Sequence, residues 1–164
     1  MNLASKLDVP FRIVSRHEIC DVIYYEKSHQ HAICATKAFK QDQVISAFSA
    51  REIMNEPSFL SVQLDQRKHI LLNPEFLQYT NHSCEPNVFF NTTQMQLIAL
   101  RDIDAGEELT FFYPSTEWEM ASPFRCQCGK QKCLKMIHGA ANVHPAILKE
   151  YKLSDFILSK IKHP

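Results

Sequence analysis

Four cysteines are the residues whose type and spacing most directly imply chemistry. Cys126, Cys128 and Cys133 lie close together in "FRCQCGKQKC", with the spacing C-x-C-x4-C, and Cys84 lies earlier, in "YTNHSCEPN". Three thiolates at this spacing can surround one ion, but structural zinc needs four ligands in a tetrahedron. Cys84 is our first candidate for the fourth ligand of a Zn²⁺ site, and His138 is the second. The alternative is a loop that carries three free thiols.

Cys20 and Cys34 have a simpler interpretation than the cluster. Each lies singly among apolar neighbours, in "EICDVIYY" and "HAICATKAF". Cysteine is among the residue types most often buried, so we expect both to be small core residues. Six cysteines in a reducing compartment favour metal binding and free thiols over a disulfide scaffold.

Charge and composition limit the classes of partner. Lys plus Arg and Asp plus Glu number 18 each in 164 residues, so the whole molecule has no general attraction to nucleic acid or anionic membranes. Lys130, Lys132 and Lys135 beside the cysteines leave a zinc-finger nucleic-acid binder as a minor alternative. The N-terminal "MNLASKLDVP" lacks the apolar stretch of a secretory signal. We therefore expect an intracellular protein, cytoplasmic or nuclear, with no membrane span.

The elements that must position these residues are mostly strands. Alternating or β-branched runs predict several small sheets, with strands at 11–15, 20–25, 43–48, 60–64, 69–72, 87–91, 95–101 and 108–113. Gly106 in "RDIDAGEE" predicts a turn before the last of these strands. Pro145 can open a helix over 145–151, and 154–161 continues helically. The sequence therefore predicts one mostly β domain with short helices and a C-terminal helical tail.

Three motifs then occur in an order that is typical of one family. "NHSCEPN" (81–87), "GEELTFFY" (106–113) and "CQCGKQKC" (126–133) match N-H-S-C-x-P-N, G-E-E-L-T-x-x-Y and the post-SET spacing C-x-C-x4-C. The chain resembles the SET-domain protein-lysine methyltransferases with a post-SET zinc segment. The resemblance implies a SET-domain fold with a knot-like C-terminal substructure. It divides the chain into an N-terminal extension (1–10), a SET domain (11–118), a post-SET zinc segment (119–140) and the helical tail (141–164).

The resemblance also implies an activity and its site. The family transfers a methyl group from S-adenosylmethionine to a lysine on a protein, which here can be a histone or a non-histone protein. By this resemblance, Asn81 and His82 hold the cofactor and Tyr113 is the active-site tyrosine. Cys84 joins the three post-SET cysteines on one zinc ion. We expect no strong binding of nucleic acid, and a monomer.

Lysine methylation needs a neutral amine, although free lysine has a pKa of about 10.4. A narrow apolar channel disfavours the ammonium form, and we take Tyr79, Phe90, Phe111 and Trp118 as candidates for its walls. Spacing alone fits Phe90 and Phe111 equally well as plain strand core. Phe111 falls where the family's phenylalanine or tyrosine influences the number of methyl groups. Because a phenyl ring lacks a hydroxyl, we expect di- or trimethylation.

Two departures from the family pattern bear on activity. Relatives carry G-x-G in the cofactor stretch, whereas Gln30, His31 and Ala32 stand here, with Gln30 and Ala32 at the glycine places. Glycine permits a close backbone approach that other residues do not allow cheaply. Phe112 stands where many relatives carry Asp. These departures support an alternative, a catalytically weak or inactive zinc-stabilised SET-fold interaction module, beside the methyltransferase that we favour.

Overall fold

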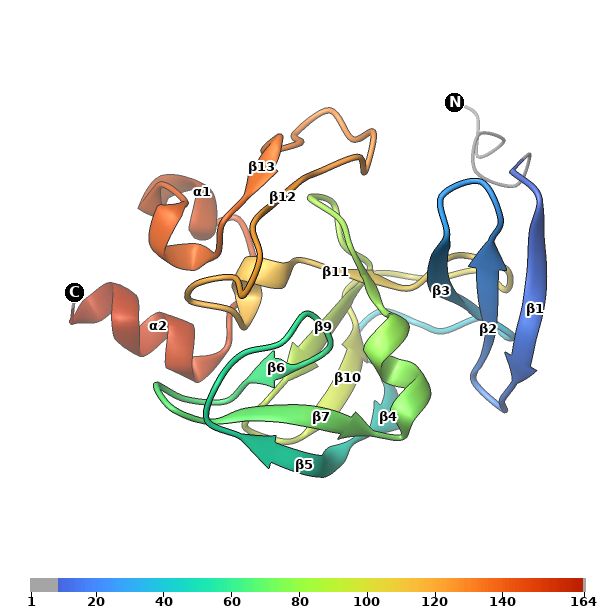
Figure 1. Cartoon of the computed structure of the whole chain (residues 1–164), viewed down its shortest axis with the longest axis horizontal. Helices are drawn as coiled ribbons and strands as arrows, with labels where there is room; N and C mark the ends of the chain where they lie inside the picture. Colours follow the sequence, from blue (N-terminus) through green and yellow to red (C-terminus); the bar gives the residue numbers. More distant parts are fainter. Residues whose placement is uncertain (1–8, 164) are drawn as a thin grey trace.

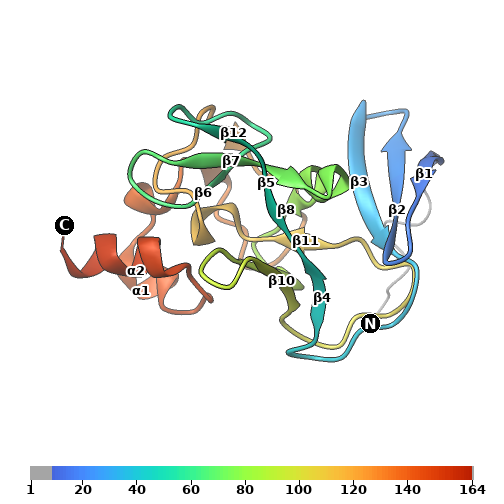
Figure 2. The same ribbon diagram turned by 90° about the horizontal axis from the view of Figure 1, so that it is seen from below.

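Small sheets surround a shared core in the computed structural model, which describes residues 9–163 (Figure 1). Most of the N-terminal extension assigned to 1–10 therefore lies outside the described residues. The first sheet is antiparallel, in the order β1 (Phe11–Arg16), β2 (Cys20–Tyr25), β3 (Gln30–Ala35). It lies at the opposite end of the molecule from the C-terminal helices, in both views (Figures 1 and 2).

Two further antiparallel sheets form the middle of the molecule. One has the order β4 (Val44–Ala47), β10 (Gln96–Ala99), β9 (Val88–Asn91). The other has the order β5 (Ser49–Met54), β7 (His69–Asn73), β6 (Val62–Gln63). The remaining strands form two pairs, β8 (Asn81–His82) with β11 (Thr110–Phe111) and β12 (Phe124–Arg125) with β13 (Met136–Ile137).

The helices are short and connect or cover these sheets. Three are 3₁₀ helices: η1 (Glu75–Tyr79), η2 (Tyr113–Ser115) and η3 (Ala140–Asn142). The C-terminal tail holds α1 (Pro145–Leu148) and α2 (Asp155–Lys162), the latter capped by the Ser154 hydroxyl, which accepts from the Ile157 N–H. None of the helices within residues 9–163 has the length and apolar character that crossing a membrane requires.

The predicted strands and helices are largely confirmed, with several differences that have local causes. The expected strand over 108–113 keeps only two residues as β11, because Pro114 lies in the 3₁₀ helix that begins at Tyr113. The expected helix over 145–151 ends at Leu148. Strands β3 and β5 and the short strands β8, β12 and β13 were not predicted. Gly106 has a φ of 88°, as its turn requires.

The main core lies between the sheets and reaches the SET motifs. Fully buried members include Val22, Ile33, Ile70, Leu97 and Leu109. Cys20 is also fully buried, as expected, whereas Cys34 is only half-buried. A second cluster joins Phe112 to the C-terminal tail through Ala140, Leu148, Leu153 and Ile157.

Segment 81–84 contacts the C-terminal half on more than one side. Strand β8 pairs in parallel with β11, with Asn81 opposite Thr110 and His82 opposite Phe111. The Tyr151 hydroxyl donates to the Cys84 carbonyl (2.7 Å). These contacts fit the knot-like substructure that the SET resemblance implies.

Gly139 holds the segment after Phe124 close to Trp118 and Glu119. Its φ is 109°, and a Cβ built there would lie 2.5 Å from the Trp118 carbonyl oxygen. A side chain at this position is therefore excluded both by backbone conformation and by space. The N–H of Ala140 next to it donates to the Glu117 carbonyl (2.9 Å).

Candidate functional site

The four predicted zinc ligands form one compact group of thiols. The sulfur atoms of Cys84, Cys126, Cys128 and Cys133 all lie within 4.8 Å of one another, and those of Cys84 and Cys126 are 3.9 Å apart. Zinc–sulfur bonds of about 2.3 Å in a tetrahedron separate the sulfur atoms by about 3.8 Å. The donor set and its spacing therefore fit a structural Zn²⁺ ion. The exposed His138 is not part of the group.

Backbone N–H groups donate to the thiols, while burial raises the pKa of Cys84 and brings that of Cys126 to about 11. Leu134 donates to Cys84 Sγ (3.4 Å), and Lys135 donates to Cys133 Sγ (3.4 Å). Burial raises the pKa of the Cys128 thiol, but hydrogen bonds that start with one from the backbone of Cys84 outweigh it and bring the pKa down to about 7. Such donors favour the thiolate, which is the form that binds a metal.

His82 links this thiol group to Tyr113, the predicted active-site tyrosine. Its Nδ1 accepts from the Tyr113 N–H (3.1 Å), and its Nε2 lies 3.3 Å from Cys84 Sγ. Burial lowers the pKa of His82 to about 4, so the ring is neutral at pH 7. A neutral ring that accepts at Nδ1 carries its proton at Nε2, which then donates to the sulfur.

The predicted cofactor stretch lies along β3, beside β8. Asn81 Nδ2 donates to the His31 carbonyl (2.8 Å), and the His31 ring stacks on Tyr79 with centroids 4.7 Å apart. Gln30 is exposed, whereas Ala32 is fully buried. Neither Gln30 nor Ala32 has a positive φ, so neither position needs glycine for its backbone conformation.

Asn87 connects the two SET motifs to each other. Its Nδ2 donates to the Glu108 carbonyl (2.9 Å), and its Oδ1 accepts from the Thr110 N–H (2.8 Å). Asn81 in the same motif also reaches the Glu108 carboxylate, at 3.3 Å. These bonds fix β11 beside β8 and so help to place Tyr113, which lies two residues after β11.

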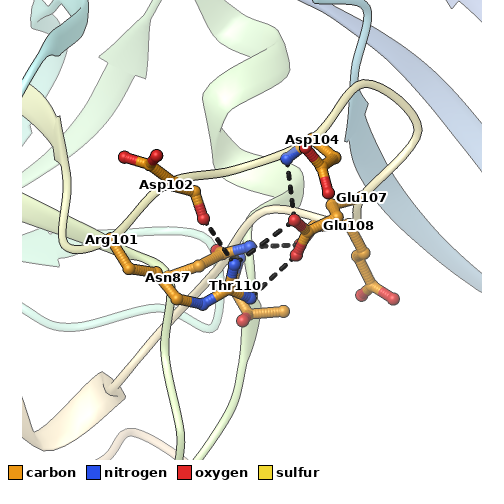
Figure 3. A network of polar contacts seen from close by, with 7 residues as sticks. All are labelled: Asn87, Arg101, Asp102, Asp104, Glu107, Glu108 and Thr110. Atoms are coloured by element: carbon orange, nitrogen blue, oxygen red, sulfur yellow. Dashed lines mark hydrogen bonds and ion pairs between the residues drawn. The ribbon is translucent and has the colours of Figure 1, made fainter. Parts of the chain in front are cut away.

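A second network holds the turn that precedes β11 (Figure 3). The Glu107 carboxylate accepts from Arg101 Nη2 (2.8 Å) and from the Asp104 N–H (2.7 Å). Burial opposes ionisation of Glu107, but the hydrogen bonds, above all the one from Arg101, lower its pKa. The first Glu of the "GEELT" motif is therefore a structural residue of the turn.

Tyr113 lies on the wall of a narrow pocket of about 30 Å³ that two of the predicted channel residues also line, Phe90 and Phe111. The Phe111 ring lies 4.7 Å from both the Phe90 ring and the Tyr113 ring. The Tyr113 hydroxyl is 3.4 Å from the Thr80 carbonyl, to which it donates. The structure thus gathers these aromatic side chains around the tyrosine that the motif singles out.

The other two predicted channel residues lie elsewhere. Tyr79 is not among the residues that line the pocket, and it stacks on His31. Trp118 packs against the C-terminal cluster, where Lys160 Nζ lies 5.1 Å from the centre of its ring. Its partners come from distant parts of the chain, which spacing along the sequence does not reveal.

Sequence reasoning missed Glu117, a buried acid on the same pocket. Its side chain is only 6% exposed, and its Oε1 accepts from the Gln63 N–H (2.9 Å) and the Thr116 hydroxyl (3.0 Å). Burial raises the pKa of Glu117 to about 7. The signal in the sequence is its position four residues after Tyr113, in "YPSTEW".

Comparisons with known proteins agree with this geometry. A model of the SET domain family matches residues 20–114. Methyltransferase flvH from Aspergillus flavus is 40% identical over 102 residues, which cover 61% of this chain and 57% of that protein. The histone-lysine N-methyltransferase, H3 lysine-36 specific, of Saccharomyces cerevisiae is 28% identical over 156 residues, covering 81% of this chain and 21% of that protein.

A solved structure shares the fold. It is KRYPTONITE in complex with mCHH DNA, H3(1-15) peptide and SAH, with a TM-score of 0.56 and 19% identity over 76% of this chain and 30% of that one. The chain thus spans about half the length of flvH and about a fifth of the yeast protein. The family match itself extends over more than half of the residues and includes two of the three motifs. The chain belongs to the SET domain family.

Proposed function

We propose that this SET domain transfers a methyl group from S-adenosylmethionine to the side chain of a lysine on a protein. The observation that carries the proposal is the placement of Tyr113. Its ring lines the narrow aromatic pocket, and its backbone N–H is bonded to His82 of the "NHSC" motif. The relatives named methyltransferase and histone-lysine N-methyltransferase support the same reaction.

The cofactor, when bound, supplies a methyl group on a sulfonium. We assign its binding to β3 and β8, through Gln30, His31, Ala32, Asn81 and His82. The residues present fit a polar ligand, because Gln30 is exposed and His31 and Asn81 are half-buried and polar, although Ala32 is fully buried. The Asn81 amide ties β8 to β3 by its bond to the His31 carbonyl. SAH in the KRYPTONITE structure supports S-adenosylmethionine as the cofactor.

The pocket residues prepare the amine. Phe90 and Phe111 give the pocket apolar walls, which disfavour an ammonium ion and so promote the neutral amine. Burial raises the pKa of Tyr113, and the carboxylates of Glu117 and Glu108 add to the effect. The hydroxyl therefore stays protonated, donates to the Thr80 carbonyl and can accept from the amine. Because Phe111 brings no hydroxyl that would restrain the amine, we expect di- or trimethylation.

The thiol group has a structural role in this proposal. Four thiolates around zinc would tie the post-SET segment to Cys84, next to His82. Met120 lines the pocket, and its N–H donates to the His138 carbonyl within that segment (2.9 Å). A folded zinc segment therefore completes one wall of the pocket.

Histones are the first substrate class to test, with a nuclear location, because relatives are named for H3 lysine-36. Non-histone proteins are the second. The chain contains 18 basic and 18 acidic residues, which gives no reason to expect a nucleic-acid substrate. We expect the protein to act as a monomer.

The experiment is methyl transfer into a mixed protein extract. The purified protein is incubated with labelled S-adenosylmethionine and a nuclear extract, and labelled residues are identified by mass spectrometry, with excess S-adenosylhomocysteine as the competition control. We expect label on lysine side chains that the competitor abolishes. Binding of the cofactor without any labelled lysine would favour the interaction-module alternative.

A further inference from the structure

Glu117 is a buried acid that has no cation to neutralise it. It lies on the pocket that Phe90, Phe111 and Tyr113 line, and only 6% of it is exposed. Its contacts are neutral donors, the Gln63 N–H and the Thr116 hydroxyl. Within residues 9–163, no Lys, Arg or His forms an ion pair with it. Buried carboxylates are usually paired, because removing an unpaired charge from water costs several kcal/mol.

Glu117 is also the one carboxylate among the described residues that line this pocket. The side chains around it are aromatic, aliphatic, hydroxyl or amide groups, and Tyr113 is the one other titratable group. The acid is therefore not part of a charged surface that happens to reach the pocket. A pocket with apolar walls and a single acid is complementary to an elongated apolar chain that ends in a cation.

Gln78 adds a hydrogen-bond acceptor that lacks a donor. It lines the same pocket, its Nε2 donates to Glu75 (3.3 Å), and its Oε1 is buried with no hydrogen-bond partner among the described residues. Buried polar atoms in native proteins are nearly always bonded. An ammonium group offers three N–H donors and no acceptor, so in the pocket that both residues line it can bond to the orphan amide oxygen or to the unpaired carboxylate.

We propose that Glu117, with Gln78, forms the amine-recognition site of this pocket and that the Glu117 carboxylate accepts a proton from the bound lysine ammonium. The proton moves from nitrogen to a carboxylate oxygen, which leaves R–NH₂ and a neutral carboxylic acid. The nitrogen lone pair then forms the new N–CH₃ bond, and the electrons of the broken S–CH₃ bond stay on sulfur. This inference rests on the proposed function, and it names the group that receives the proton.

The electrostatics of the site support this role. Because burial raises the pKa of Glu117 to about 7, both of its forms are populated near neutral pH. The residues that contact it from β6 and from the adjoining turn, Gln63 and Thr116, are neutral, and Tyr113 stays protonated. In water the lysine ammonium has a pKa of about 10.4. The apolar walls of the pocket lower this pKa toward that of the Glu117 carboxyl group.

Glu117→Gln is the first test, because the amide keeps an oxygen that can accept from the Gln63 N–H. Glu119→Gln is the matched control, since Glu119 is exposed and does not line the pocket. Methylation rates are measured from pH 6 to pH 10, with kcat and KM separated. We expect Glu117→Gln to lower kcat at pH 7 by about 10²-fold, the scale of general base catalysis. The loss should shrink as the pH rises and solvent deprotonates the amine.

A binding measurement keeps the inference testable without turnover. n-Butylamine, which mimics the end of a lysine side chain, and 1-butanol, its neutral analogue, are titrated by NMR in the presence of S-adenosylhomocysteine. The parent should bind the amine more tightly than the alcohol, and Glu117→Gln should lose that preference while its circular dichroism spectrum stays parental. Glu117→Asp, which keeps the charge, should restore part of it.

The outcomes separate this inference from the proposed function. A parent that methylates lysines, together with a Glu117→Gln variant of parental rate at every pH, overturns the inference and leaves the function intact. A loss of rate that is equal at all pH values, with amine binding retained, makes Glu117 a structural residue and also overturns it. A parent that methylates no lysine but prefers the amine through Glu117 refutes the function and retains the recognition site.

Discussion

The ring of Phe112 stacks on the ring of Tyr151, with centroids 3.7 Å apart and an angle of 7° between the planes. Phe112 is buried in the cluster that joins the SET domain to the tail, together with Leu148 and Ile157. The Tyr151 hydroxyl donates to the Cys84 carbonyl (2.7 Å). A carboxylate in place of Phe112, as in many relatives, would be buried among apolar side chains. Phe112, which departs from the family pattern, therefore packs against the helical tail.

Substitution of Tyr151 tests this docking of the tail. Tyr151→Phe keeps the stack and removes one hydrogen bond, which we expect to lower the free energy of unfolding by about 1 kcal/mol. Tyr151→Ala also removes the ring, and a loss of roughly 2–4 kcal/mol is expected for this half-buried side chain. Urea denaturation measures both. Equal losses for the two variants would mean that the stack contributes nothing.

Cys84→Ser tests the metal site. The parent should carry one zinc per chain, and the variant should lose it, because three thiolates leave the tetrahedron incomplete. Cys34→Ser is the control, since Cys34 lies outside the thiol group. Metal content by mass spectrometry and protease sensitivity of segment 126–133 are the readouts. Full zinc retention in Cys84→Ser would point to His138 as the fourth ligand.

The double change Gln30→Gly with Ala32→Gly tests whether the missing glycines matter. Both residues already have extended backbone in β3, and Ala32 is fully buried. We expect no gain in affinity for S-adenosylhomocysteine by calorimetry, and a loss of roughly 0.5–1 kcal/mol of stability for each glycine. A several-fold tighter complex would show that the parental side chains obstruct the cofactor.

The ionisation of Glu117 should make the stability of the protein depend on pH. Burial raises its pKa from the ordinary value of 4.5 to about 7, so the folded state binds a proton more tightly than the unfolded state. The tighter proton binding adds roughly 3 kcal/mol to the free energy of unfolding. This contribution is complete below about pH 4 and is lost as the pH rises through about 7. Glu117→Gln lacks it, so the difference in unfolding free energy between variant and parent should favour the variant more at pH 8.5 than at pH 5. A difference that is the same at both pH values would contradict the raised pKa.

The sequence predicts the motifs better than the packing around them. Local patterns identify the four thiols, and the family resemblance implies that Cys84 completes the group, as the structure has it. Strand β5 was missed because "SAREIM" is exposed along almost its whole length and has no apolar alternation. Strand β3 was missed because Ala and Cys at its centre are weak strand formers.

The pocket residues also differ in how far the sequence predicts their positions. Phe90 and Phe111 were candidates for the channel that spacing alone fitted equally well as strand core, and the fold places both on the pocket. The positions of Tyr79 and Trp118 depend on partners, His31 and Lys160, that are far away in sequence. The burial of Glu117 depends on the folded sheets around it. Composition gives no reason to expect a buried acid, since acids are rarely buried.

Tyr113→Phe gives the most direct test of the central claim, that Tyr113 is the active-site tyrosine of a lysine methyltransferase. The hydroxyl can order the amine in the transition state, and an interaction made only there raises the rate without strengthening ground-state binding. We therefore expect the variant to lose at least about 10²-fold in lysine methylation by mass spectrometry, while calorimetry shows nearly unchanged binding of S-adenosylhomocysteine. Methylation at the parental rate by Tyr113→Phe would contradict the account.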